Sequence, residues 1–316
     1  MSERLNSNVA YDVLGDILEI LRFRGTVFFH SELAAPWGMS LAQSECPRFH
    51  IALAGTCFVG SEENSPIPVQ ESDIVVVPGG RYHWIADQPG RDLVSSERAQ
   101  DACELDEPLF QQGAITNKLL CGLVQFDQGA RHPLLDALPD VMHFPRQDQN
   151  GAIWSIVALI DAELRTSRPG GNRIADRMME VLFLKLLHQF VAQAEDATGF
   201  VAALRDRRVY RALTLIHAEP EFDWTLAALG ERVGMSRATL VRRFQDVVGM
   251  TPMAYIQDWR IMKAHSLVCH SSASLEQIAD ATGFASARSL SRTFKRHYGY
   301  TPHELRRSRG GLDAAE

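Results

Sequence analysis

The last third of the chain repeats one pattern of apolar and polar positions. The first copy reads TLAALGERVGMSRATLVRRFQDVVGMTP from Thr225, and the second reads SLEQIADATGFASARSLSRTFKRHYGYTP from Ser274. Apolar residues, glycines and prolines recur in both copies at an offset of 49 residues before the central turn and 50 after it. A duplication this regular predicts two copies of one structural unit.

Each copy carries the start and stop signals of two helices. Thr225 and Ser274 are suitable N-caps, and Gly234 or Gly283 ends the short helix that follows. A serine shortly after each glycine can cap a second helix of about three turns. Helix, glycine turn and helix form the helix-turn-helix arrangement, whose second helix enters the DNA major groove.

The predicted second helices have one apolar face and one outward face. Leu240 and Phe244 in the first unit, and Leu290 and Phe294 in the second, share a face at helical spacing and should lie in the core. The opposite faces are expected to point outward and comprise Ala238, Val241, Arg242 and Gln245 in the first unit and Arg288, Ser291, Arg292 and Lys295 in the second. The alternative is an ordinary helical bundle with a solvated charged face.

The segment from Leu204 to Arg309 resembles the DNA-binding domain of AraC/XylS-type transcription regulators. The most specific motif is A-x-x-x-G-F-x-S-x-x-x-L-S-R-T-F-K-R-x-Y-G-x-T-P, from Ala279 to Pro302. In that family both second helices insert into successive major grooves of double-stranded DNA. The resemblance implies base contacts from Ala238, Val241, Arg242, Arg288 and Arg292. It implies phosphate contacts, which position the protein without specifying sequence, from Arg237, Arg243, Thr293 and Arg296.

A long helix is predicted between the two units. It should start at Pro252, a favoured first residue, and run to Val268, a length of about 25 Å. With the widths of the flanking units, the two second helices would stand roughly one duplex turn, about 34 Å, apart. Arg260 falls on the apolar face of this helix, so we expect it to be buried against a carboxylate.

The charge is divided unequally along the chain. Residues 205–309 hold 17 of the 32 Lys and Arg and 10 of the 39 Asp and Glu, which gives +7. The rest of the chain carries −14, so only the duplicated region is suited to attract phosphate. No apolar run is long enough to cross a membrane, and the N-terminus lacks an apolar signal core, which predicts a cytoplasmic protein.

The first half reads as mostly β. The segment from Tyr11 to Phe23 is either a short helix or a strand leading in. The segment 95–117 is polar and acidic and is expected to be a loop. Short apolar runs separated by turn residues predict a sandwich or barrel; they cover residues 26–33, 37–42, 49–60, 73–79, 83–87 and 119–127.

Two motifs in this half resemble those of cupin barrels. Pro78, Gly80 and His83 match the second cupin motif, although Ser72 replaces its first glycine, and Gly55 matches the end of the first motif. This combination is similar to the sensor half of one AraC-type subgroup. The predicted fold class is therefore α+β, with a cupin-like β-barrel, a helical hairpin and an all-α domain of two helix-turn-helix units.

The resemblance places a metal-binding centre in doubt, because the paired histidines of the first cupin motif are absent. Arg48 occupies the place of the motif's glutamate, and His50 points to the same face of its strand. His50, His83 and Cys121 form a candidate inward cluster that could ligate zinc or another divalent ion. The alternative is a histidine pair satisfied by internal hydrogen bonds.

The cysteines suggest a second sensing chemistry. Cys46, Cys57 and Cys121 fall in or beside predicted strands, and a thiol next to Arg or His can have a lowered pKa and be oxidised selectively. Some cupin-bearing relatives of this type are oxidant sensors. The alternative is that these thiols are inert and buried.

Two amphipathic helices are predicted between the two halves, at 152–164 and 173–194, joined by the breaker SRPGGN. They form a hairpin that either mediates a homodimer or packs on its own barrel. The predicted domains are the cupin-like sensor (1–148), the hairpin (149–199), the DNA-binding domain (200–309, with helix-turn-helix units at 225–248 and 274–298) and a disordered tail (310–316).

The sequence thus predicts a sequence-specific transcriptional regulator with no catalytic residues. Its barrel would receive a signal, an unidentified small molecule, metal or oxidant, and shift the chain between two states. RNA polymerase is a further candidate partner, and no membrane is involved. The competing hypothesis is a metal-dependent cupin dioxygenase or isomerase that a DNA-binding domain tethers to DNA.

Overall fold

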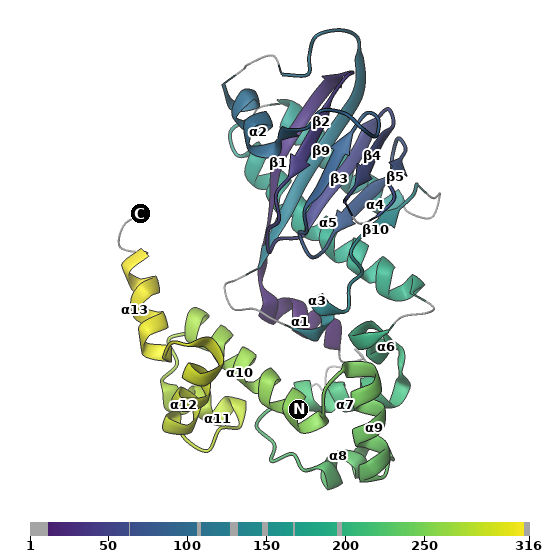
Figure 1. Cartoon of the computed structure of the whole chain (residues 1–316). Helices are drawn as coiled ribbons and strands as arrows, with labels where there is room; N and C mark the ends of the chain where they lie inside the picture. Colours follow the sequence, from purple (N-terminus) through teal and green to yellow (C-terminus); the bar gives the residue numbers. More distant parts are fainter. Residues whose placement is uncertain are drawn as a thin grey trace, which may run out of the picture. The chain divides into compact units, whose positions relative to one another are not determined.

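The computed structural model describes residues 12–62, 64–105, 109–126, 132–146, 151–166, 168–194 and 198–312 (Figure 1). The chain divides into two compact units, each made of separate segments. The barrel unit consists of residues 23–127 and 138–195, and the helical unit consists of residues 1–22, 128–137 and 196–316. No helix in the described part of the chain is long and apolar enough to cross a membrane.

The barrel unit is built from two five-stranded sheets among the described residues. Their orders are β1-β9-β3-β6-β10 and β5-β4-β7-β2-β8, and all paired neighbours are antiparallel except β2 and β8. The strands are β1 (Phe23–Ala34), β2 (Gly38–Leu41), β3 (Arg48–Ala54), β4 (Cys57–Gly60), β5 (Ile67–Val69), β6 (Ile74–Val77), β7 (His83–Ala86), β8 (Val94–Ser95), β9 (Ile115–Phe126) and β10 (Met142–Phe144). This arrangement confirms the predicted cupin-like barrel.

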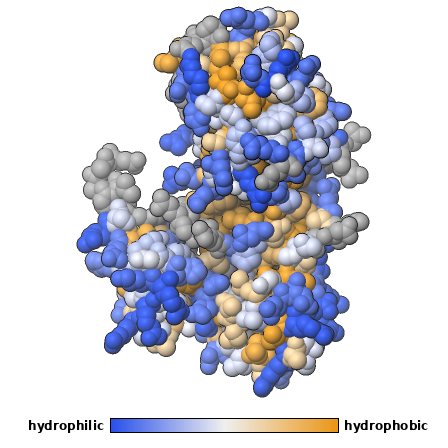
Figure 2. Space-filling model, in the orientation of Figure 1, coloured by the Kyte–Doolittle hydropathy of each residue, from blue (hydrophilic) through white to orange (hydrophobic). Residues whose placement is uncertain are grey.

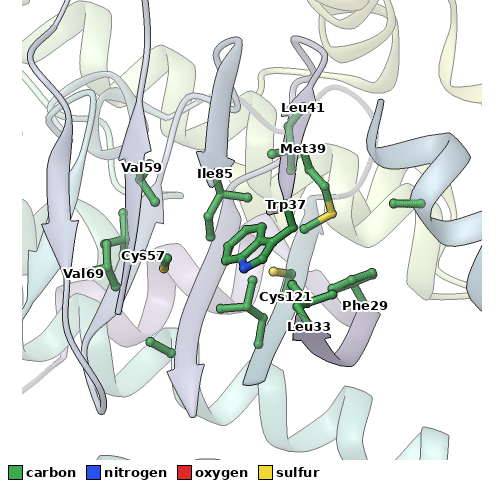
Figure 3. Close-up of a cluster of buried hydrophobic side chains, with 14 residues drawn as sticks. Phe29, Leu33, Trp37, Met39, Leu41, Cys57, Val59, Val69, Ile85 and Cys121 are labelled. Carbon is green, nitrogen blue, oxygen red and sulfur yellow. The ribbon is translucent and has the colours of Figure 1, made fainter. Parts of the chain in front are cut away.

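Alternation along β3 assigns its side chains to the two faces of its sheet. Ala52 belongs to the buried cluster between the sheets, which Figure 3 shows around Trp37, and His50 points to the same face. Phe49 points the other way and packs edge-to-face on Phe183, with 5.8 Å between ring centroids. The strand is buried on both faces because a helix covers the outside of this sheet.

That helix is α5 (Gly171–Gln193), which pairs with α4 (Gly151–Thr166) in the predicted hairpin. The carboxylates of Asp176 and Glu180 accept the backbone N–H groups of Val27 (3.1 Å) and Gly25 (3.3 Å) in β1. The contact is close: a Cβ on Gly25 would lie 2.7 Å from the Asp176 carbonyl oxygen. One face of the hairpin therefore packs on its own barrel.

The helical unit contains both predicted helix-turn-helix units. The caps act as predicted: the side chains of Thr225 and Ser274 accept backbone N–H groups, and Gly234 and Gly283 end the first helices in left-handed conformations. The helices of this unit are α1 (Val13–Leu21), α3 (Pro133–Asp136), α6 (Gly199–Arg205), α7 (Arg207–Ala218), α8 (Leu226–Val233), α9 (Arg237–Val248), α10 (Pro252–His270), α11 (Leu275–Thr282), α12 (Ala287–Tyr298) and α13 (Pro302–Leu312).

The connecting helix α10 starts at Pro252 as predicted and ends two residues later than expected. Arg260 is half-buried, but the prediction that it pairs with a carboxylate is wrong. Its guanidinium donates to the backbone carbonyls of Pro220 and Phe222, both at 2.7 Å. Carbonyl oxygens of the loop between α7 and α8 satisfy this arginine, and no sequence pattern identifies such acceptors.

Segments on either side of the barrel strands complete the core of the helical unit. Helix α1 precedes β1 and contacts α7 and α10, whereas α3 follows β9 and contacts α6. These units differ from the predicted domains, which assigned 1–148 to the barrel. The polar segment 95–117 also differs from its prediction, because it contains α2 (Ser96–Glu104) and the start of β9. In the predicted tail, α13 continues to Leu312, and residues 313–316 lie outside the described residues.

A chain of buried hydrogen bonds joins these segments. The His132 Nδ1 atom accepts the N–H of Leu134 (3.0 Å), so neutral His132 carries its proton on Nε2, which donates to the Tyr255 hydroxyl (3.2 Å). The Tyr255 hydroxyl in turn donates to His217 Nε2 (2.7 Å). The proton of neutral His217 then lies on Nδ1, 3.4 Å from the Asp16 carboxylate of α1.

We predict that the free energy of unfolding falls when the pH drops below about 6.5. Burial lowers the pKa of both His132 and His217, and for His217 it outweighs the nearby Asp16 carboxylate. Below its ordinary pKa the unfolded chain binds more protons than the folded chain, so stability that is present above pH 6.5 is lost. Each unit by which folding lowers a histidine pKa corresponds to about 1.4 kcal/mol of unfolding free energy that is lost at low pH. Thermal unfolding from pH 8 to pH 5, followed by circular dichroism, measures this.

A His132→Asn variant is the control, because His50 and His83 in the barrel titrate in the same direction. The variant should show a shallower decline than the wild-type chain. Equal declines in both proteins would contradict a buried neutral His132.

Candidate functional site

The second helices of the two helix-turn-helix units present exposed arginines. In α9, Ala238 and Arg242 are exposed and Val241 is partly buried; in α12, Arg288 and Arg292 are exposed. Figure 2 shows a hydrophilic surface over α11 and α12. Side-chain caps from the serines at 236 and 286 fix where both helices begin. The five predicted base-contact residues are therefore arranged on helices as the sequence indicated.

The opposite faces hold these helices in place. Leu240 and Phe244 of α9, and Leu290 and Phe294 of α12, have no exposed surface. Phe294 stacks on His265 of α10 with 5.6 Å between ring centroids. The apolar face fixes the rotation of each helix, so the arginines point outward as a consequence of packing.

The predicted phosphate contacts are less uniform. Arg237 and Arg296 are exposed. Arg243 is half-exposed and its Nε atom pairs with the Asp206 carboxylate at 2.6 Å. Thr293 is buried, with 8% of its surface exposed, because it lies next to Phe294 on the packed side of α12. The structure therefore does not support Thr293 as a phosphate contact.

Inside the barrel, the three residues of the predicted metal cluster are in contact. Cys121 is the cross-strand partner of His50, and its Sγ atom lies 3.2 Å from His50 Nδ1. The Nε2 atoms of His50 and His83 are 2.8 Å apart, and His83 Nδ1 donates to the Arg81 carbonyl (2.7 Å). His83 Nε2 must then accept from His50 Nε2–H, and His50 Nδ1 accepts the Cys121 thiol proton.

This arrangement is a line of hydrogen bonds, and it does not fit a three-ligand metal site. An ion between the two Nε2 atoms could take both histidines, but Cys121 lies on the other nitrogen of His50. Among the described residues, no group of three or more His, Cys, Asp or Glu side chains is arranged to hold a metal ion. Burial lowers the pKa of His83 to about 4 and that of His50 well below its usual value, so both rings are neutral near pH 7.

The thiols of the barrel are not activated. Burial raises the pKa of Cys57 to about 12 and raises the pKa of Cys121 further. Figure 3 shows both side chains within the apolar cluster, from β4 and β9. For Cys46, burial raises the pKa more than the Arg48 guanidinium lowers it. The lowered thiol pKa that the sequence suggested does not occur at these three positions.

A cavity of about 390 Å³ opens into the barrel unit. His83 lines it, so one end of the hydrogen-bond line reaches the cavity while Cys121 lies at the buried end. Most of the other lining side chains are polar or aliphatic, and they include Gln43, Val77, Arg81, Tyr82 and Asp140. Arg81 and Asp140 form an exposed ion pair at 3.3 Å. This cavity gives a small molecule access to His83 and, through it, to the histidine pair.

Sequence reasoning missed the residues that join α1 and α3 to the helical unit. The prolines that follow His132 favour a structural role for it, but no local pattern links it to Asp16 or His217. Their contacts depend on segments more than 80 residues apart, which periodicity and caps cannot pair.

This chain combines a barrel with two helix-turn-helix units, which is the domain arrangement of DNA-binding regulators with a receptor domain. A model of the Cupin family matches residues 12–192, and a model of a helix-turn-helix domain family matches residues 229–308. The chain belongs to the AraC-type transcriptional regulators that carry an N-terminal cupin domain.

Two regulators are similar to this chain over nearly its whole length. The HTH-type transcriptional regulator AlkR of Acinetobacter baylyi is 28% identical over 306 residues, which cover 93% of this chain and 99% of AlkR. A putative AraC-like transcription regulator of Streptomyces lividans is 29% identical over 306 residues, covering 94% and 98%. Such relatives support a regulator and not an enzyme.

One solved structure, an AraC-type DNA-binding domain protein from Chromobacterium violaceum, is 32% identical to this chain. The match covers 34% of this chain and 96% of that one, with a TM-score of 0.32.

We predict that Cys46 reacts with iodoacetamide before Cys57 and Cys121 in the folded protein. Cys46 is partly exposed, whereas the other two thiols are buried and their raised pKa values disfavour the reactive thiolate. Mass spectrometry of peptides after timed labelling measures the order. Labelling in denaturant, where the three thiols should react at similar rates, is the control. Equal rates in the folded protein would contradict the buried placement.

Proposed function

We propose that this regulator reads two successive major-groove segments with α9 and α12, acts as a homodimer, and takes its signal as a small molecule in the barrel cavity. The proposal that α9 and α12 bind the major groove rests on the duplicated helix-turn-helix unit and its outward-facing arginines. The 19 residues of α10 span about 28 Å. With the flanking units this length is compatible with one helical repeat of DNA, about 34 Å.

The reading assignment divides between the two units. Arg288 and Arg292 place two guanidinium groups on α12, each suited to guanine, whereas α9 offers Arg242 between Ala238 and Val241. We therefore propose that the first unit discriminates partly by apolar contact, for instance with thymine methyl groups. The second unit would discriminate chiefly through its arginines.

The barrel cavity supports a small-molecule signal. Its lining brings neutral histidine, charged and aliphatic groups together, as a ligand site does. Metal or oxidant sensing by the line from Cys121 to His83 has less support, because the ligands do not converge and the thiol is buried. We propose a cytoplasmic location, where a regulator of this class meets its DNA.

The dimer proposal rests on the outer face of the hairpin. Ile174 and Val181 of α5 are 44% and 45% exposed, and Leu159 of α4 is 51% exposed. Ile174 and Val181 are seven residues apart and so lie on one face of α5, away from the face that covers the barrel. Exposed aliphatic side chains on helices that already have a packed side favour a second copy of this chain as their partner.

Alanine at Arg242 or Arg292 should weaken binding to a DNA site selected from randomised duplexes. Each bidentate contact to guanine contributes about 1–3 kcal/mol, so we expect roughly a tenfold to hundredfold loss of affinity and relaxed preference at one base pair. Arg173→Ala, an equal change of charge in the exposed part of α5, is the matched control. Mobility shifts at fixed salt measure the affinities. If Arg242→Ala and Arg292→Ala both bind as tightly as wild type and the control, the assignment of these arginines to base contacts is wrong.

Replacing Val181 with glutamate should convert the dimer to a monomer. The charge would be buried without a partner at the proposed interface, whereas it stays hydrated in a monomer. Light scattering coupled to size exclusion gives the mass. The control is Leu105→Glu, which introduces the same charge at a position that is 68% exposed elsewhere on the barrel unit. A wild-type monomer, or a Val181→Glu dimer of unchanged affinity, would refute this interface.

A further inference from the structure

Arg48, at the start of β3, carries a guanidinium that is partly buried and lacks partners. Its Nε and Nη1 atoms are inaccessible to solvent and donate to no described residue. No described carboxylate forms an ion pair with it, and Glu97 of α2, the acidic residue with the strongest influence on its pKa, is exposed. Buried N–H groups without acceptors cost free energy, and a buried charge costs more.

The strand register places Arg48 with the barrel interior. Arg48 and His50 are two residues apart in β3, so both side chains point to the same face of the strand, the face between the sheets. Its cross-strand partner is Val77 of β6, and side chains directly opposite in an antiparallel pair share a face. Val77 and His83 both line the cavity of about 390 Å³. Arg48 does not itself line the cavity, but it is close enough to His83 for its charge to lower the pKa of that ring.

The two histidines near Arg48 carry no charge. His50 and His83 are uncharged near pH 7, partly because the Arg48 charge itself opposes their protonation. The Arg81 guanidinium, also at the cavity, is already paired with Asp140. Among the described residues of the barrel, the positive charge of Arg48 has no ion-pair partner, and one negative charge of a ligand would balance it.

We propose that Arg48 is the anchor for a small organic carboxylate, which is the signal that the barrel receives. The Nε–H and the neighbouring Nη2 form an edge that donates two parallel hydrogen bonds to a carboxylate. A monoanion matches the single unpaired charge, whereas a phosphate monoester would bring nearly twice that charge. The apolar part of the ligand would occupy the cavity beside Val77.

This proposal deepens the small-molecule part of the proposed function and rests on it. It also gives the signal a physical effect. A carboxylate on this edge of the guanidinium would give the buried Nε–H its missing acceptor and would balance the charge of Arg48, so the bound and free barrels would differ in the arrangement around β3. A ligand shifts a protein only between states that it binds differently, and this difference supplies such a bias.

The test uses the full-length chain and a panel of acetate, butyrate and benzoate, each compared with its uncharged amide. We expect at least one carboxylate, and not its amide, to raise the melting temperature by several degrees at saturating concentration. Arg48→Met should lose this response. Its ligand-free melting temperature should equal or exceed that of wild type, because the substitution removes an unpaired buried charge.

Two further variants complete the experiment. Arg48→Lys keeps the charge without the planar fork and should respond more weakly than wild type. Arg24→Met, at an exposed position of β1, should respond as wild type does. The proposal is overturned if no carboxylate stabilises wild type, if amides act equally, if Arg48→Met keeps the response, or if its ligand-free form melts several degrees lower. DNA affinity measured on the same preparations tests the reading function separately.

Discussion

The Tyr255 hydroxyl is the point on which the helical unit depends. It accepts from His132 and donates to His217. The Tyr255 ring stacks on Phe200 and on His217, which in turn stacks on Trp259, and it meets His132 edge-to-face. Through His132, and through Asp16 next to His217, helix α10 is joined to residues that come after β9 and before β1. The buried contacts around Tyr255 therefore include residues from outside the C-terminal segment.

This connection has a consequence for signalling. Helix α1 is followed directly by β1, and the segment that holds α3 follows β9. Within the barrel unit, Phe23 at the start of β1 is the register partner of Phe126 at the end of β9. Two of the covalent connections between the units thus begin at paired residues of neighbouring strands. If a ligand rearranges β3, which pairs with β9, these covalent connections offer a route by which the change would be transmitted to the helical unit.

Much of this organisation could be predicted because its signals are local. The caps at Thr225 and Ser274, the glycines that follow, and the apolar faces ending in Phe244 and Phe294 each act within a few residues of their own position. The alternation in β3 likewise indicated that His50 faces inward. Which side chains meet in the barrel interior depends on the strand register, which local patterns do not give. The sequence therefore could not predict that Cys121, His50 and His83 form a line of hydrogen bonds in place of a set of ligands around one metal ion. The acceptors of Arg260 and the role of Asp16 depend on tertiary packing for the same reason.

The central claim is that one chain reads DNA twice through α9 and α12. Hydroxyl-radical and base-modification footprinting on a selected site tests it most directly. The account predicts two protected major-groove segments for each chain, separated by about one helical turn, and Arg288→Ala should remove protection from one segment only. A single protected segment for each chain, or two segments that both weaken equally in that variant, would contradict it.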